Sequence, residues 1–515
     1  MTKGIVGALS LAALVFFAVL ALVLGKEAAW DFQNYHWYTP YALLNGRRMF
    51  DIAVAHHATY YSPLLDLPLW WIANAGPGWW GGVWLGLHAG ASAILIAAIA
   101  WHVLPLHGAT IRLAVASLLG FFGALGGGTM SQIGSTSNDI LVGLPVLASL
   151  LVLLLAADCK RWWMLLLAGV LCGFAVGAKL TTGIYAVGSL GALLFLAGGP
   201  RAKLRAIVLF GLGGAIGAAI TGGFWWYALW RETGNPLFPF ANTIFKSPLI
   251  KIADYSDPTF RPRDWFTRIL FPFIFTTDSR KVAEWDFRDV RIAVAYVLAF
   301  VMLVAMVAKR TSADPLADRV RGRMLLAYVA GAYLPWALVF GIYRYALPIE
   351  MLAPVAIAVL IGWTDAPRAA RVATVVLLTV MTQAMVSFSL ERASFAGRYV
   401  EVQMQPLEPD AMVLGTGKYP YSYVIPSAPP SVPWLRIDGW LVGPKDGTGL
   451  TAILEERVAA HRGPLYVIFS DWERNYRDQA LAAYGLDADD ASCSTVTSNI
   501  GRPLGLCRVV RRGST

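Results

Sequence analysis

An acidic side chain stands in an aromatic segment directly beyond the first apolar run of the sequence. Asp31 and Asn34 belong to the segment 30–37, whose sequence is WDFQNYHW. A carboxylate at a membrane surface can act as a general base that takes a proton from an attacking hydroxyl. It can equally be a solvated interfacial residue or the N-cap of a helix. Spacing alone favours these plainer roles.

Two basic residues stand at the ends of apolar runs. Lys179 follows the run 163–178, and Arg344 lies between the runs 324–342 and 345–363. Because an ionised side chain inside a membrane costs a few kcal/mol, each cation is expected to have a partner. A phosphodiester headgroup is one candidate, and the planar donor fork of Arg344 suits phosphate oxygens. Snorkelling of Lys179 to the lipid surface and an ion pair for Arg344 are the alternatives.

Polar and aromatic residues in two further segments are candidate substrate contacts. His56, His57, Tyr60 and Tyr61 follow in the same early loop as Asp31. Adjacent histidines rarely converge on one metal ion without other ligands, so hydrogen bonding or a plain loop role is the better hypothesis. A second polar segment, 135–139, contains Asn138 and Asp139. Asp139 is a single acid, and its simplest use is to cap the following helix.

The elements that must position these residues are membrane helices. The chain has 515 residues, of which 57% are hydrophobic and only 14% charged, whereas about a quarter are charged in ordinary soluble domains. Apolar runs of roughly 17–25 residues can cross a bilayer. We therefore predict an all-α polytopic membrane protein with about eleven transmembrane helices, at 4–25, 79–104, 113–128, 139–157, 163–178, 183–199, 206–229, 291–308, 324–342, 345–363 and 373–390.

Positive charge in alternate loops predicts the orientation of these helices, since such charge marks the cytoplasmic face. The first run is expected to be a retained helix rather than a cleaved signal peptide, with its N-terminus inside a bacterial cytoplasmic membrane. Loops 26–78 and 230–290 and the segment 391–515 then face the periplasm. The net charge of +10 thus reflects topology and does not indicate a nucleic-acid partner. The basic residues on the predicted inner side are Lys3, Arg112, Lys160, Arg161, Arg201, Lys203, Arg205, Lys309, Arg310, Arg319, Arg321, Arg323, Arg368 and Arg371.

The outer segments differ in character. The two loops mix aromatic and charged residues, which predicts short interfacial helices. Residues 391–515 predict a small α/β domain, with strands at 411–416, 465–470 and 506–510 and a helix at 473–484. We therefore divide the chain into a transmembrane catalytic module, 1–390, and a periplasmic domain, 391–515. In that domain Cys493 and Cys507 form a disulfide or remain separate thiols, and the sequence leaves both open. Cys159 and Cys172 lie at or within membrane helices.

Ordered motifs across the first 390 residues resemble the GT-C superfamily of polytopic glycosyltransferases. The superfamily includes protein O-mannosyltransferases, aminoarabinose transferases and polyprenol-phosphate-mannose enzymes. The motifs are Asp31 beyond the first helix, then YALLNG at 41–46, YYSPLL at 60–65, GNPLFP at 234–239 and RYALP at 344–348. Many relatives have an acidic pair where this chain has Asp31 followed by Phe32, so the branch stays open.

The resemblance implies an inverting transfer of a sugar from a polyprenyl-phosphate-linked donor. It assigns the catalytic base to Asp31 and a phosphate-binding role to Arg344, and we extend that role to Lys179. The acceptor is expected to be a glycan, a lipopolysaccharide or cell-envelope precursor, or a protein. Phosphate is a good leaving group, so we expect metal-independent chemistry with no cofactor.

Two other functions fit a polytopic protein. A polysaccharide polymerase or O-antigen ligase is one, but such enzymes carry their large functional loop late in the chain. A transporter of lipid-linked sugars is the other. Transporters show internal repeats and ionisable residues near the bilayer centre, and neither pattern is visible here. The sequence therefore favours the glycosyltransferase.

Overall fold

The computed structural model describes residues 2–157, 161–389, 391–395 and 397–512. Lys160 and Cys159 lie outside the described residues. The chain folds into two compact units. The first comprises 1–24, 83–223 and 257–390, and the second comprises 25–82, 224–256 and 391–515. The prediction of a boundary between 1–390 and 391–515 stays a prediction. The second unit does take up the C-terminal segment from Glu391 onward. It also contains the loop 26–78 and the first part of the loop 230–290, up to residue 256, whereas residues 257–290 belong to the first unit.

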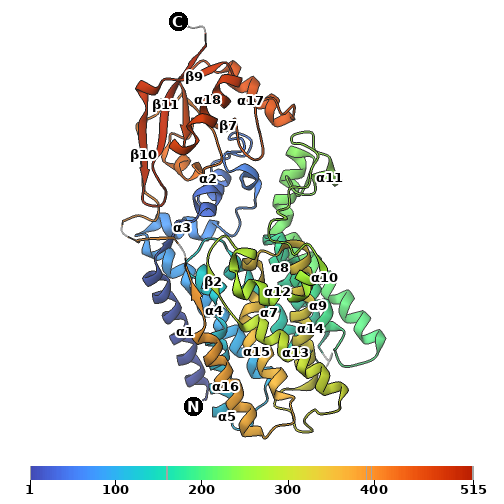
Figure 1. Ribbon diagram of the computed structural model, residues 1–515. Coiled ribbons are helices and arrows are strands. Elements are labelled where there is room, and N and C mark those ends of the chain that lie inside the picture. Colours follow the sequence, from blue (N-terminus) through green and yellow to red (C-terminus); the bar gives the residue numbers. More distant parts are fainter. Residues whose placement is uncertain (1, 158–160, 390, 396, 513–515) are drawn as a thin grey trace. The chain divides into compact units, whose positions relative to one another are not determined.

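The first unit is helical (Figure 1). A short strand pair, β2 (Phe287–Arg288) with β3 (Ser387–Phe388), accompanies its helices. The first residues of α4 and the last of α10 belong to the second unit. The helices are α1 (Thr2–Leu24), α4 (Trp79–Val103), α5 (Ala109–Gly123), α6 (Gly127–Gln132), α7 (Asp139–Leu155), α8 (Trp162–Ala178), α9 (Gly183–Leu193), α10 (Pro200–Thr233), α12 (Trp265–Thr277), α13 (Arg291–Val307), α14 (Arg319–Pro335), α15 (Leu347–Gly362) and α16 (Arg368–Ala384).

The predicted apolar runs correspond to these helices. Among the described residues, five helical segments are long and apolar enough to cross a membrane, and five shorter apolar helices accompany them. The chain is thus a multi-pass membrane protein, while the count of eleven spans stays a prediction. Helix α15 is buried along its whole length and packs against α5, α7, α13, α14 and α16. A helix that is hydrophobic all round belongs at the centre of a bundle.

Close packing of α8 against α10 follows from small residues at four-residue spacing. Gly169, Gly173 and Gly177 form one stripe on α8. A Cβ atom at Gly173 would lie within 3 Å of the backbone of Gly214 on α10, and one at Gly169 would clash with the carbonyl of Phe210. Such stripes let membrane helices approach until their backbones touch. A larger residue at either glycine would force the two helices apart.

The second unit contains a mixed sheet with the strand order β5-β10-β11-β8-β6-β7, and β9 pairs with β11. β6 runs parallel to β7 and β8. Helices α17 (Gly449–Ala460) and α18 (Arg474–Ala483) lie beside this sheet in Figure 1. The predicted C-terminal α/β domain is confirmed. The strands are β5 (Val402–Gln403), β6 (Met412–Gly415), β7 (Trp434–Arg436), β8 (Leu465–Phe469), β9 (Leu486–Ala488), β10 (Ser494–Ser498) and β11 (Leu504–Arg511).

The early loop, residues 26–78, is built into this second unit. It forms β1 (Lys26–Glu27), paired with β4 (Arg392–Ala393), and the helices α2 (Tyr38–Leu44) and α3 (Leu67–Ala75). Ile52 N–H donates to the Trp434 carbonyl, and the Ile52 carbonyl accepts from Arg436 N–H, so this residue lies beside β7. Ile52 also shares one buried core with Leu435 and Val467. The loop therefore folds as part of the unit and not as a polar linker.

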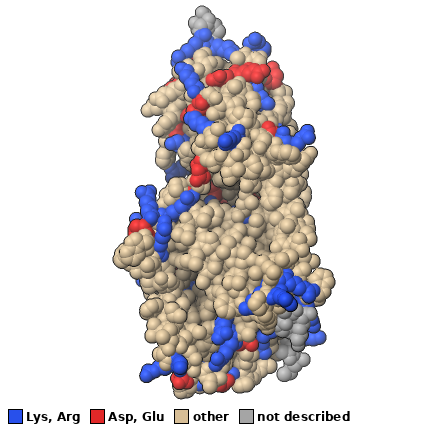
Figure 2. All heavy atoms as spheres, turned by 90° about the vertical axis from the view of Figure 1, so that its right-hand side faces the viewer, with Lys and Arg blue, Asp and Glu red and all other residues tan. Residues whose placement is uncertain are grey.

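The second unit contains a disulfide, and the first unit contains a free cysteine. Figure 2 shows groups of acidic and basic side chains on one face of the molecule, together with wide uncharged areas. Cys493 and Cys507 form a disulfide, which resolves the alternative left open by the sequence. Cys172 is a buried free thiol in α8.

Candidate functional site

Lys179 and Arg344 converge on one carboxylate in the first unit. Lys179 Nζ lies 2.6 Å from Asp139 Oδ1 and 2.9 Å from the Ser137 carbonyl oxygen. Arg344 Nε lies 4.0 Å from Asp139 Oδ2. The side chains of Lys179 and Arg344 are 20% and 18% exposed, whereas that of Asp139 is 4% exposed. Both cations therefore have a protein partner and remain partly exposed.

The ring of Tyr345 lies beside both cations of this cluster. Lys179 Nζ is 5.3 Å and the Arg344 guanidinium carbon is 5.5 Å from the ring centroid. The Tyr185 hydroxyl donates to the Tyr345 carbonyl at 2.6 Å, which holds that residue in place. An aromatic face attracts a cation by its quadrupole, so Tyr345 helps to hold both basic side chains at one place.

The local backbone explains how these residues meet. Lys179 follows α8 in an extended conformation, so the chain turns where its side chain reaches Asp139. Asn138 is the N-cap residue of α7 and has a left-handed backbone (φ +63°), which asparagine tolerates better than most residues. The expected capping role of Asp139 is wrong. Asp139 is the first residue of α7, Asn138 occupies the cap position, and the Asp139 carboxylate binds Lys179 instead.

A second buried carboxylate binds the N-terminus of α6, the short helix that precedes the segment with Asn138 and Asp139. Glu350 Oε1 and Oε2 accept the backbone N–H groups of Thr129 and Gly128, each at 2.9 Å, at the start of α6. Asp289 accepts the N–H of Gly127 at 2.9 Å. Carboxylates at a helix N-terminus satisfy donors that otherwise lack partners. The sequence analysis did not single out Glu350 or Asp289, because their partners lie far away in the chain.

Asp31 stands in the second unit, at the start of an unusual helical segment. It is half-buried and occupies the N-cap position of the π-helix η1 (Phe32–His36), without a capping hydrogen bond from its side chain. Gln33 Nε2 donates to the carbonyls of Ala28 and Ile500, at 2.6 and 3.0 Å. The segment that follows Asp31 is therefore held by hydrogen bonds both to the preceding residues and to the C-terminal segment.

Asn34 and Tyr60, two of the predicted substrate contacts, make hydrogen bonds that hold the loop together. Asn34 is fully buried and donates through Nδ2 to the Ala55 carbonyl at 3.1 Å. Tyr60 is buried, and its carbonyl accepts from Trp225 Nε1 at 2.9 Å. The Tyr61 ring contacts the rings of Tyr35 and Phe240, with centroids 5.4 and 5.7 Å away. Their contact with a substrate stays a prediction.

The adjacent histidines point to different partners. His56 Nδ1 accepts the N–H of Trp440 at 3.2 Å, and Nε2 lies 3.2 Å from the Lys418 carbonyl. Burial, together with the charge of Arg436, lowers the pKa of His56 well below its usual value. His57 packs on the ring of Tyr255, and burial lowers its pKa to about 4. Both rings are therefore neutral at pH 7, and His56 joins the early loop to the C-terminal segment.

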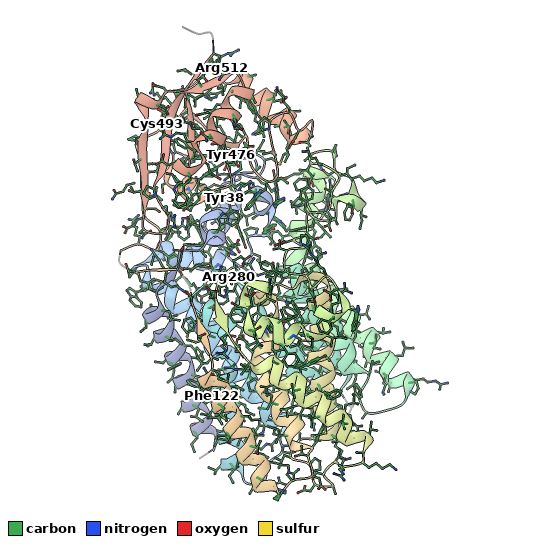
Figure 3. All side chains as sticks on the ribbon, viewed as in Figure 1. Tyr38, Phe122, Arg280, Tyr476, Cys493 and Arg512 are labelled. Atoms are coloured by element: carbon green, nitrogen blue, oxygen red, sulfur yellow. A yellow bond between two sulfur atoms is a disulfide. The ribbon has the colours of Figure 1, made fainter. Side chains whose placement is uncertain are left out.

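Two buried arginines that the sequence analysis missed reinforce the same loop. Arg47 binds Asp51 through two bonds, Nε to Oδ2 at 2.6 Å and Nη2 to Oδ1 at 2.7 Å. Tyr38, labelled in Figure 3, donates to Asp51 at 2.9 Å. Arg436 is fully buried and donates to the carbonyls of Val54, Gly417 and Tyr419. The four-residue spacing of Arg47 and Asp51 was the one feature of the sequence that could have indicated their ion pair.

Metal ligands cluster at one place among the described residues. Asp490, Cys493 and Cys507 lie close enough to share an ion. Both cysteines are joined in the disulfide, and a thiolate rather than a disulfide sulfur ligates metal. This cluster is therefore not a metal centre.

Comparison with known proteins bears on the fold. No protein-family model and no curated protein matches the sequence. Among solved structures, the chain is similar to ArnT from Cupriavidus metallidurans bound to undecaprenyl phosphate, with 13% identity and a TM-score of 0.54 over 98% of each chain. It also aligns with an oligosaccharyltransferase from Archaeoglobus fulgidus tethered to an acceptor peptide, with 10% identity and a TM-score of 0.43 over 92% of this chain and 70% of that one. The likeness to ArnT shows that this chain has the GT-C fold that the sequence motifs led us to expect.

Proposed function

We propose that the chain is an inverting membrane glycosyltransferase that moves a sugar from a polyprenyl-phosphate donor to an acceptor hydroxyl. The observation that carries the proposal is the convergence of Lys179 and Arg344 on Asp139 in a protein with the fold of ArnT, whose structure holds undecaprenyl phosphate. Basic side chains are the groups that bind phosphate oxygens, and the arginine fork does so bidentately.

The proposed roles fall to three residues: Asp31 in the second unit, and Lys179 and Arg344 in the first. Asp31, half-buried at the start of η1, takes the proton from the acceptor hydroxyl as its oxygen attacks the anomeric carbon. The bond from that carbon to the phosphate oxygen breaks, and the polyprenyl phosphate leaves with the electron pair. Lys179 and Arg344 stabilise the negative charge that grows on the leaving phosphate. Because phosphate leaves readily, this reaction proceeds without a metal ion.

The periplasmic orientation belongs to the same proposal. The disulfide between Cys493 and Cys507 supports it, since disulfides persist in oxidising compartments such as the periplasm. The acceptor is then a periplasmic or lipid-linked glycan, an envelope precursor or a protein.

Asp31→Asn tests the proposal. A strain that lacks the gene is complemented with the wild-type chain or the variant, and its envelope glycolipids are compared by mass spectrometry. Loss of a general base lowers the rate by about 10²–10⁴, so the product should vanish while the donor accumulates. Asp471→Asn, at an exposed carboxylate of the second unit, is the matched control. Full activity of a folded Asp31→Asn protein would refute the assignment of the base.

Two further measurements test the remaining roles. Lys179→Met should weaken the binding of undecaprenyl phosphate to the purified protein without unfolding it, and unchanged binding would remove Lys179 from the phosphate site. Treatment with EDTA should leave the transfer rate unchanged if no metal takes part, and loss of activity that Mg²⁺ or Mn²⁺ restores would contradict the metal-independent reaction.

A further inference from the structure

A cavity of about 310 Å³ lies entirely within the second unit. Its walls come from α2, from the turn that follows it, from residues near the end of η2 (His56–Tyr60), and from the C-terminal end of α10. This volume is at the lower end of the range for small-molecule sites. The cavity therefore suits a compact ligand such as a single sugar ring.

Part of the polar lining is already committed to the fold. Arg47 and Asp51 bind each other and are 2% and 0% exposed. Asp51 also accepts the N–H of Trp434 at 2.9 Å, and Tyr38 donates to it. These three side chains form a rigid polar wall.

The other part of the lining is accessible. Arg48 Nε lies 2.7 Å from Glu232 Oε1, and the two side chains are 35% and 28% exposed. The Arg48 guanidinium lies over the ring of Trp225, 5.5 Å from its centroid. The Thr59 hydroxyl accepts the N–H of Ala55 at 2.8 Å, and a hydroxyl that accepts a bond can still donate its own proton. A carboxylate, a guanidinium and a hydroxyl thus stand beside an aromatic wall.

The charges of the lining select the kind of ligand. Two arginines, Arg47 and Arg48, are matched by two carboxylates, Asp51 and Glu232. A phosphate or other anion would lie against Glu232 and be repelled, because like charges destabilise each other. A ring with several neutral hydroxyl groups can instead donate to Glu232 and accept from Arg48 and Thr59.

We propose that this cavity is a binding site for a neutral sugar ring, contacted by Glu232, Arg48 and Thr59. The source of the ring, the acceptor glycan or the sugar of the donor, rests on the proposed function. The binding itself does not, because none of the residues assigned there to base or phosphate chemistry lines the cavity.

Binding is tested on the full chain in detergent by saturation-transfer NMR. The probes are methyl glycosides of glucose, galactose, mannose and N-acetylglucosamine. At least one glycoside should bind, and Glu232→Gln should weaken it at least tenfold. Asp487→Asn removes a carboxylate from an exposed ion pair with Arg512, outside the cavity lining, and should leave binding unchanged. Thr59→Val gives a second variant in case Glu232→Gln does not fold.

Several outcomes would overturn the inference. One is that no glycoside binds the wild-type chain, and another is that the folded cavity variants bind the glycoside as well as wild type does. A third is that inorganic phosphate displaces the bound glycoside as effectively as free glycoside does. Competition by the polyprenyl-phosphate-linked form of the bound sugar identifies the source, since displacement points to the donor and coexistence to the acceptor. Asp31→Asn should bind glycosides normally. If no glycoside binds the wild-type chain but Asp31→Asn loses sugar transfer, this inference is refuted and the proposed function is not. If glycosides bind and Asp31→Asn keeps full sugar transfer, only the assignment of the base is refuted.

Discussion

The buried ion pair between Arg47 and Asp51 should be the most sensitive polar contact of the second unit. Its two bonds measure 2.6 and 2.7 Å, and both side chains are almost fully buried. Arg47 also donates to the carbonyls of Pro430 and Val432, at 2.6 and 2.7 Å. Through these bonds, residues of the early loop hold the segment that leads into β7. Asp51→Ala would leave the guanidinium buried without its counter-charge.

The cost follows from that uncompensated charge. Removal of one partner of a buried ion pair costs about 3–5 kcal/mol. For a domain of this size each kcal/mol lowers the Tm by about 2–4 °C, so Asp51→Ala should lower it by roughly 6–20 °C. The measurement is thermal unfolding of the detergent-solubilised protein, followed by near-ultraviolet circular dichroism and by proteolysis of the segment 391–515.

Two further variants make this prediction specific. Asp446→Ala removes a carboxylate from an ion pair of similar length, with Lys251, in which the lysine is 62% exposed. An exposed pair contributes about 0–1 kcal/mol, so this control should barely change the Tm. The double variant Arg47→Met/Asp51→Leu removes both charges and should recover part of the loss. A change below about 2 °C in Asp51→Ala, or additive losses in the double variant, would refute the reasoning.

Two other predictions concern the same unit. Burial lowers the pKa of His57 to about 4 from the ordinary 6.5, so the unfolded chain takes up a proton between these values while the folded chain stays neutral. The folded state should therefore lose stability as pH falls from 6.5 to 4, by at most about 3 kcal/mol. The loss measured over this window should be larger in wild type than in His57→Gln, and a smaller loss in wild type would contradict the lowered pKa of His57. The disulfide between Cys493 and Cys507 closes a loop of 14 residues. Its removal in Cys493→Ser/Cys507→Ser should cost about 3 kcal/mol in unfolding by urea, and an unchanged midpoint would show that the link does not stabilise the folded state.

Long apolar runs allowed the helices of the first unit to be predicted from the sequence. The run 345–363 corresponds to α15 and the run 163–178 to α8, because an uninterrupted apolar stretch of that length has few alternatives to a membrane helix. The strands β6, β8 and β11 were recognisable for a similar reason, since short apolar stretches bounded by polar turns indicate buried strands. Secondary structure thus followed from local composition.

Contacts between distant residues were not predictable in the same way. Lys179 and Asp139 are far apart in the chain, and only the fold places Nζ 2.6 Å from a carboxylate oxygen. His56 has a residue type that suits substrate contact, yet its surroundings bury it and bind both ring nitrogens. Residue type indicates what a side chain can do, whereas burial and partners decide what it does. For this reason the sequence analysis missed the buried contacts of these residues, while their contact with a substrate stays a prediction.

The backbone beyond Asp31 shows why this difference matters for catalysis. A π-helix is rare, and none of its residues has an intrinsic preference for it. In η1 this conformation is held by tertiary contacts: Gln33 to Ile500 and Asn34 to Ala55. His36 Nδ1 lies 2.8 Å from Asp66 in a buried pair, and the Ser422 hydroxyl donates to the Asn34 carbonyl. A general base acts efficiently only when its carboxylate is held in position before the reaction begins. The polar residues of this loop therefore serve the proposed chemistry indirectly, because their bonds to the C-terminal segment determine where the chain that carries Asp31 can lie.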